Sequence, residues 1–143
     1  METDHETAPR PVQSLIPAPP AAATGAWGER RAEDYLRRER NFGVLARNWR
    51  NPRDRREEID LVALDGEVLV FVEVKTRAAG ARVPGYFAVD RRKRRALRRA
   101  ARAFLGGLDR PPRTFRFDVV EVTPGPEGAA LRHFENVGLF CRA

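Results

Sequence analysis

The chain has 143 residues and a formal net charge of +7, from 27 basic and 20 acidic residues. This length is typical of a single domain with one hydrophobic core. One cysteine excludes an internal disulfide framework and a cysteine-rich zinc site, and two distant histidines argue against a histidine-based metal cluster. No apolar run approaches the roughly 20 residues of a membrane span, and the first residues lack the order of a signal peptide. We therefore expect a cytoplasmic protein.

The positive charge is concentrated in one part of the chain. Residues 77–116 hold 13 basic and two acidic residues, whereas the remainder has a net charge of −4. A basic block beside an acidic remainder favours a surface that binds the phosphates of a nucleic acid. The alternative is an arginine-rich helix that is simply solvated. Arginine supplies 25 of the 27 basic residues, so that Lys75 and Lys93 are the only lysines.

The first half of the chain is predicted to hold a tail, a helix and two strands. Residues 1–24 are rich in proline and alanine without periodicity, so we expect a disordered tail before a domain over residues 25–143. Apolar residues at helical spacing predict an amphipathic helix over residues 26–40. Alternating apolar and polar residues then predict strands over residues 44–49 and 58–63.

The second half is predicted to hold the central strand, the basic helix and two further strands. The near-continuous apolar run over residues 68–75 is typical of a strand buried on both faces. A loop with Gly and Pro at residues 77–86 precedes a helix over residues 91–105, and strands follow at residues 115–122 and near 131–136. The order α-β-β-β-α-β-β predicts an α/β domain in which helices flank a mixed sheet.

Charged residues within the predicted central strand point to chemistry. Glu73 and Lys75 are two residues apart, so both side chains lie on the same face of the strand. Charges rarely stand in such a strand unless they are paired or bind a metal. Asp60 precedes a short hairpin, so its carboxylate can come alongside that of Glu73. A third acid from the first helix, Glu29 or Glu33, would complete a set.

Two interpretations of these residues are open at this point. Two carboxylates forced together repel each other unless a cation sits between them, and oxygen ligands suit Mg²⁺ or Mn²⁺ rather than zinc. Lys75 is unusual in an arginine-rich chain, and a compact ammonium can orient a water or neutralise a developing charge. The structural alternative is an ion pair between Glu73 and Lys75 at the end of the strand.

Short motifs in a fixed order cover residues 25–137. They are Gly28-Glu29…Ala32…Tyr35-Leu36, Ala46-Arg47-Asn48-Trp49-Arg50, Glu58-Ile59-Asp60-Leu61-Val62-Ala63, Val70-Phe71-Val72-Glu73-Val74-Lys75-Thr76-Arg77, Ala88-Val89-Asp90…Lys93 and Phe117-Asp118-Val119-Val120. This combination resembles the YraN-like uncharacterised bacterial protein family. That family is similar to Holliday-junction resolvases and restriction-type nucleases of the PD-(D/E)XK fold.

The resemblance implies a restriction-endonuclease-like fold and a catalytic role for four side chains. Asp60 takes the aspartate position, Glu73 the second acid, Lys75 the lysine of the E-x-K element, and Glu29 the glutamate of the first helix. Asp60, Glu73 and the carbonyl of Val74 would bind the Mg²⁺ or Mn²⁺. In such enzymes the metal activates a water for attack on a phosphodiester. A homodimer is implied as well.

We therefore expect a metal-dependent endonuclease-like protein that hydrolyses DNA, including branched DNA. Arginines of the basic segment would hold the phosphodiester backbone: Arg77, Arg91, Arg94, Arg95, Arg98, Arg99 and Arg102. The alternative is a non-catalytic nucleic-acid-binding or assembly module that retains the fold. Asp118 is expected to pair with a basic residue of the second helix, or else to stand beside the site. RNA as the substrate stays open.

Overall fold

The computed structural model describes residues 25–77, 90–126 and 128–139. Its elements are α1 (Gly25–Arg38), β1 (Gly43–Asn51), β2 (Asp54–Asp65), β3 (Val68–Thr76), α2 (Arg91–Gly106), β4 (Phe115–Gly125) and β5 (Gly128–Phe134). This order confirms the α/β class and the sequence of elements predicted above. The expected tail and residues 78–86 of the expected loop lie outside the described residues.

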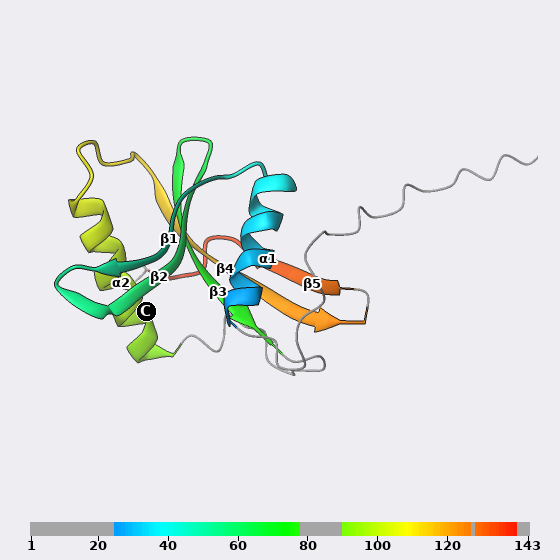
Figure 1. Ribbon diagram of the computed structural model, residues 1–143. Coiled ribbons are helices and arrows are strands. Elements are labelled where there is room, and N and C mark those ends of the chain that lie inside the picture. The colour runs from blue at the N-terminus through cyan, green and yellow to red at the C-terminus, as the bar shows by residue number, and fades with distance from the viewer. Residues whose placement is uncertain (1–24, 78–89, 127, 140–143) are drawn as a thin grey trace, which may run out of the picture.

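The five strands form one mixed sheet in the order β1-β2-β3-β4-β5 (Figure 1). Only the pairing of β3 with β4 is parallel, and these two strands are joined through a connection that contains α2. The other neighbours pair antiparallel, and Gly66 at φ +60° makes the tight turn between β2 and β3. The central position of β3 accounts for its continuous apolar sequence.

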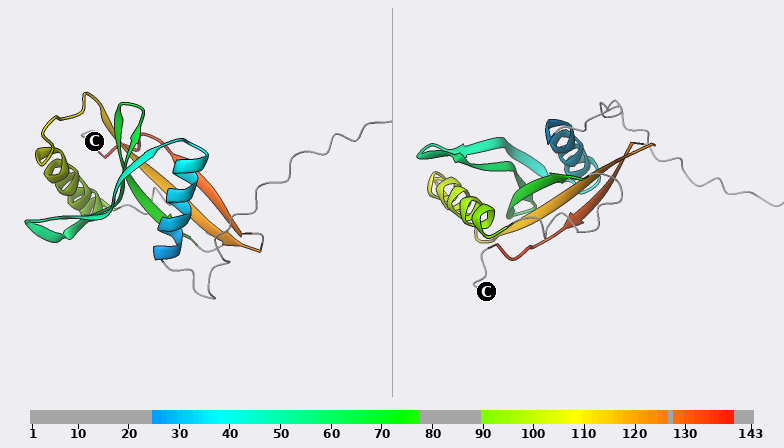
Figure 2. Two further views of the ribbon diagram at one scale, coloured as in Figure 1. Left: turned by 45° about the horizontal axis from the view of Figure 1, so that its top comes forward. Right: turned by 90° about the horizontal axis from the view of Figure 1, so that it is seen from below.

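Each face of the sheet packs against one helix, so the molecule has two apolar layers (Figure 2). On one face, Trp27 and Leu36 of α1 pack with side chains of β3 such as Val70 and Val72. On the other face, Leu97 of α2 packs with residues that include Phe71, Phe117 and Leu139. Neither helix is long and apolar enough to cross a membrane.

The hairpin of β1 and β2 extends beyond the rest of the sheet and bends over α2 (Figure 2). Trp49 of this hairpin meets Phe104 of α2 edge to face, with ring centroids 5.3 Å apart. Within β1, Asn48 has a φ of 47°, which is unusual for a residue other than glycine. The hairpin and α2 therefore form the two walls of a groove.

Several predicted boundaries are displaced in the structure, among them those of α1, β2 and β5. Helix α1 ends at Arg38 rather than at residue 40. Strand β2 begins at Asp54, because its pairing with β1 continues through a charged stretch that has no apolar alternation. Strand β5 spans Gly128–Phe134 rather than residues near 131–136, since it pairs with β4 down to the turn and Asn136 has a φ of 53°.

Candidate functional site

Asp60 lies where β2 separates from β3. The backbone pairing of these strands ends at Leu61 and Val72. Beyond that point a carboxylate oxygen of Asp60 accepts a hydrogen bond from the backbone N–H of Val74, at 2.8 Å. The side chain thus takes over a position that a backbone carbonyl of a paired strand would fill. The last residues of β3 are therefore not paired with the backbone of β2, and the Asp60 carboxylate lies beside them.

Glu73 is the centre of the charged cluster. It is buried, with 3% of its surface exposed, and its Oε1 lies 3.3 Å from Lys75 Nζ and 3.5 Å from Lys93 Nζ. The contact with Lys75 confirms that residues 73 and 75 share one face of the strand. The second oxygen, Oε2, is buried and has no hydrogen-bond partner among the described residues. One oxygen of this carboxylate is therefore paired and the other is available.

Gly28 brings α1 against the end of β3. A Cβ at this position would stand 1.9 Å from Thr76 Oγ1, so no side chain fits between the helix and the strand. The next residue, Glu29, then faces the site: with its amide oriented to donate, Asn48 reaches Glu29 at 3.0 Å and Glu58 at 3.1 Å. Glu29 is the acid of the first helix that lies close enough to feel the charge of Glu73.

Glu33, the other candidate of the first helix, has a different role. Its carboxylate accepts hydrogen bonds from Arg47 Nε at 2.6 Å and Nη2 at 2.5 Å, and Arg37 lies 3.0 Å away. These contacts join α1 to β1. Of the two candidate acids of the first helix, Glu33 thus pairs with Arg47 and Arg37, and Glu29 is the one whose charge interacts with that of Glu73.

The pKa values of two acids show that their negative charge has too few positive or hydrogen-bonding partners at this site. Burial, together with the nearby charge of Glu73, raises the pKa of Asp60 from 3.8 to about 8, although the bond from Val74 N–H opposes the shift. Burial also raises the pKa of Glu29, as do Glu58 and Glu73, against the hydrogen bond from Asn48. A cation at the site would favour the charged forms of both acids.

The donor atoms suit a cation that keeps part of its water shell. Among residues 25–77, 90–126 and 128–139, no three His, Cys, Asp or Glu side chains converge into a cage for a metal ion. Mg²⁺ commonly binds through one or two carboxylates and retains several waters. Asp60 and Glu73, with its unpartnered Oε2, fit that requirement.

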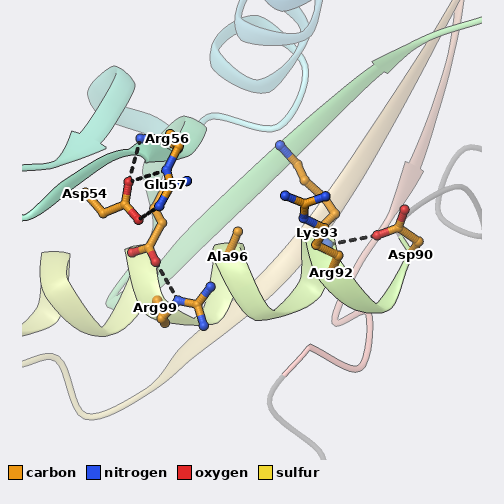
Figure 3. Close-up of a pocket in the computed structure, with 8 residues that line it drawn as sticks. All are labelled: Asp54, Arg56, Glu57, Asp90, Arg92, Lys93, Ala96 and Arg99. Atoms are coloured by element: carbon orange, nitrogen blue, oxygen red, sulfur yellow. Dashed lines mark hydrogen bonds and ion pairs between the residues drawn. The ribbon is translucent and has the colours of Figure 1, made fainter.

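A groove of about 370 Å³ lies between β2 and the first turns of α2, and it is linked to this cluster through Lys93 (Figure 3). Its walls come from the hairpin of β1 and β2 and from the first turns of α2. The lining residues are Asp54, Arg56, Glu57, Asp90, Arg92, Lys93, Ala96 and Arg99. Figure 3 shows Lys93 and Arg92 at one end of the groove and the pair of Glu57 and Arg99 at the other. Lys93 both lines the groove and contacts Glu73.

The arginines expected to bind phosphates fall into two groups. Arg91, Arg95 and Arg102 are exposed on α2. Arg99 instead pairs with the buried Glu57, and Arg98 donates a hydrogen bond to the carbonyl of Leu139 at 3.3 Å. The first group is available to a ligand, whereas Arg98 and Arg99 also hold the fold together. Arg94 is half-buried, and Arg77 continues the pairing of β3 with β4 through its backbone N–H.

Asp118 corrects one expectation. It does not pair with α2: Arg116 donates to it at 2.9 and 3.1 Å, His133 Nε2–H at 2.8 Å and the backbone N–H of Asn136 at 2.9 Å. Arg116 stands two residues before Asp118 on the same face of β4. His133 and Asn136 come from β5 and the segment after it, which the sequence spacing could not place beside Asp118. Asp118 is fully buried and belongs to the scaffold rather than to the site.

Comparison with known proteins identifies the family of this chain. The model of a family described as "Uncharacterised protein family UPF0102" matches residues 28–122. The chain belongs to this family. The match confirms the resemblance to YraN-like proteins, and it contains Glu29, Asp60, Glu73, Lys75 and Lys93.

Several relatives in this UPF0102 family are similar over most of their length. A UPF0102 protein of Beutenbergia cavernae is 47% identical over 117 residues, which cover 81% of this chain and 96% of the relative. The UPF0102 protein STH1475 of Symbiobacterium thermophilum is 49% identical over 106 residues, covering 73% and 85%. A UPF0102 protein of Chlorobaculum parvum is 42% identical over 112 residues, covering 78% and 84%.

The structure adds two residues to the site that the spacing of the acids did not predict. Lys93 reaches Glu73 from α2, and Asn48 joins Glu29 to Glu58. The scarcity of lysine, which singled out Lys75, applies equally to Lys93 and is a signal that could have found it. Asn48 offered no such signal, because its two partners, Glu29 and Glu58, lie on other elements, α1 and β2.

Proposed function

We propose that this protein hydrolyses phosphodiester bonds of DNA, with Mg²⁺ or Mn²⁺ held by Asp60 and Glu73. The observation that supports this most is the buried, unpartnered Oε2 of Glu73 near the half-buried carboxylate of Asp60, whose pKa is raised to about 8. A fold gains nothing from leaving such groups uncompensated. They are common where a protein prepares a site for a ligand.

Each side chain has a distinct role in the proposed reaction. The N–H of Val74 fixes the Asp60 carboxylate, while Lys75 and Lys93 hold Oε1 of Glu73. When bound, a divalent cation would lower the pKa of a water and stabilise negative charge on the phosphate. Lys75, whose side chain is 27% exposed, would orient the attacking water or meet the charge that develops on the phosphate.

The substrate class rests on the charge of α2. Arg92 and Arg99, both exposed on this helix, line the groove, and arginine suits phosphate groups because its guanidinium binds them in pairs of hydrogen bonds. The carbonyl of Val74 would be a further ligand of the cation, and Glu29 would hold a proton or a bound water at the edge of the site.

Cleavage assays test this function directly. Labelled four-way junction, flap and linear duplex DNA are incubated with Mg²⁺ or Mn²⁺ and the wild-type protein, alongside single-stranded RNA as a further substrate. We expect cation-dependent cleavage of DNA that Glu73→Gln abolishes. Glu67→Gln is the matched control, because Glu67 is an exposed glutamate on the turn before β3. An active Glu73→Gln variant would contradict the proposal.

One observation favours a second candidate, a non-catalytic nucleic-acid-binding module. Two ammonium groups already pair with Oε1 of Glu73, as in a structural ion-pair cluster. Such a module would bind DNA equally well with and without a divalent cation and would leave every substrate intact. The cleavage assay and a binding assay in EDTA therefore separate the two functions.

A further inference from the structure

Both lysines of this chain meet at one oxygen atom. Lys75 from β3 and Lys93 from α2 lie 3.3 and 3.5 Å from Glu73 Oε1, although arginine supplies the other 25 basic residues. The two positions are far apart in the sequence and belong to different elements. The residue directly before Lys93 and the two directly after it are arginines, so a lysine at this position is a local exception.

The chemistry of the two cations explains this exception. An arginine guanidinium is a planar fork that commonly binds both oxygens of a carboxylate, whereas a lysine ammonium is a compact point charge. At position 93 a guanidinium would reach across the buried carboxylate of Glu73 and engage Oε2 as well as Oε1. The ammonium pairs with Oε1 and leaves Oε2 without a partner among the described residues.

We propose that Lys93 is a positioning residue of the site: it holds Glu73 by one oxygen, keeps the other free for a divalent cation, and cannot be replaced by arginine. The inference rests on the proposed function, because it assigns the free oxygen to the metal.

The surroundings of Lys93 support this role. Asp90 caps α2 by accepting a hydrogen bond from the backbone N–H of Lys93 at 2.8 Å, which fixes the first turn of the helix. The side chain of Lys93 is 39% exposed and lines the groove beside Arg92 (Figure 3). Lys93 thus lines the groove, where a phosphate would approach, and also contacts the buried carboxylate of Glu73.

The first experiment tests the pairing without metal. Lysine labelled with ¹³C at Cε gives two signals in NMR spectra of this protein, because the chain has two lysines. We expect Glu73→Gln to shift both signals, whereas Glu67→Gln should leave both in place. A signal of Lys93 that does not respond to Glu73→Gln would overturn the inference, whatever the protein's activity.

The second experiment measures Mn²⁺ affinity by calorimetry for the wild type, Lys93→Arg and the exposed control Arg110→Lys. We expect Lys93→Arg to weaken binding about 10- to 100-fold, the range for residues that orient metal ligands, and Arg110→Lys to bind as the wild type does. Equal affinity of the wild type and Lys93→Arg would overturn the inference alone. A wild type that binds no Mn²⁺ would overturn the proposed function together with it.

The charge-neutral variant Lys93→Gln separates positioning from a structural ion pair. If Lys93 served only to neutralise Glu73, Lys93→Arg would bind Mn²⁺ as the wild type does. Only Lys93→Gln, which removes the positive charge, would then change the affinity for Mn²⁺. The proposal predicts that Lys93→Arg weakens Mn²⁺ binding at least as much as Lys93→Gln. Circular dichroism of both variants verifies that they are folded.

Discussion

Two buried acidic centres stand in the same sheet and differ in how their charge is compensated. Asp118 on β4 is fully buried and accepts four hydrogen bonds, from Arg116, His133 and the backbone of Asn136. Burial alone would raise its pKa, but these bonds hold the pKa of Asp118 below its ordinary value. At the other centre the pKa of Asp60 is raised to about 8, and Glu73 Oε2 has no partner among the described residues.

The difference separates a centre whose charge is compensated within the fold from the centre that we propose binds a ligand. A buried charge with a full set of donors stabilises one conformation and has no capacity for a further partner. A buried pair of carboxylates with too few donors costs stability, and a bound cation would recover that cost.

Asp118→Asn should be strongly destabilising. The substitution leaves the buried His133 and the half-buried Arg116 facing an uncharged amide, and breaking a buried ionic network costs about 3–5 kcal/mol. Urea unfolding followed by circular dichroism measures the loss. The exposed Asp109→Asn serves as the control, and a similar stability of the two variants would remove the scaffold role of Asp118.

Asp60→Asn should change the free energy of unfolding in the opposite direction and stabilise the metal-free protein. The pKa of Asp60 is higher in the folded protein, so the stability linked to its proton is complete below about pH 4 and is lost as the pH rises to about 8. An asparagine still accepts the bond from Val74 N–H and carries no charge. In EDTA we expect the free energy of unfolding of Asp60→Asn to exceed that of the wild type by on the order of 2 kcal/mol at pH 8, and the difference should shrink toward pH 5. Urea unfolding at several pH values measures this difference. A gain that is independent of pH would contradict this account.

Gly28→Ala should loosen the attachment of α1 to the site. The new Cβ collides with Thr76 Oγ1, and overpacking of this kind costs about 1–3 kcal/mol. The double variant Gly28→Ala/Thr76→Ala removes the obstructing hydroxyl and should recover part of the loss. Thermal unfolding of the two single variants and the double variant forms a double-mutant cycle, and strictly additive effects would argue against the contact.

Replacement of the exposed arginines Arg91, Arg95 and Arg102 by alanine should flatten the salt dependence of DNA binding. Each lost phosphate contact lowers the slope of log K against log salt by about 0.9. Fluorescence anisotropy with duplex DNA at several salt concentrations gives the slope. Arg98→Ala is a comparison variant, because Arg98 bonds to Leu139 and its loss should affect stability more than the slope.

The order of the elements and three residues of the candidate site, Asp60, Glu73 and Lys75, follow from the spacing of apolar and charged residues in the sequence. The apolar run of β3, the alternation of β4 and the stripe of α2 reflect burial of each element against its neighbours, so the order of elements was predictable. Glu73 and Lys75 were predictable as neighbours because the two-residue period of a strand fixes their shared face. Asp60 was predictable because a short hairpin returns β2 to β3.

The remaining parts of the site depend on packing between distant elements. Glu29 and Glu33 are four residues apart on α1 and share a helix face, so only the contact of Gly28 with Thr76 and the pairing of Glu33 with Arg47 distinguish them. Arg116 is two residues before Asp118 on the same face of β4, so the two-residue period of a strand makes them neighbours. His133 and Asn136 required the register of β4 and β5, in which Val120 is opposite His133. No local pattern encodes the contacts of these two residues.

Calorimetric titration of Mn²⁺ into the metal-free protein tests the central claim most directly. The claim is that Asp60 and Glu73 form a cation site. The wild type should bind Mn²⁺, and neither Asp60→Ala nor Glu73→Ala should bind it, while Asp109→Asn should bind as the wild type does. A wild type that binds no Mn²⁺, or binding that survives both alanine substitutions, would contradict the account.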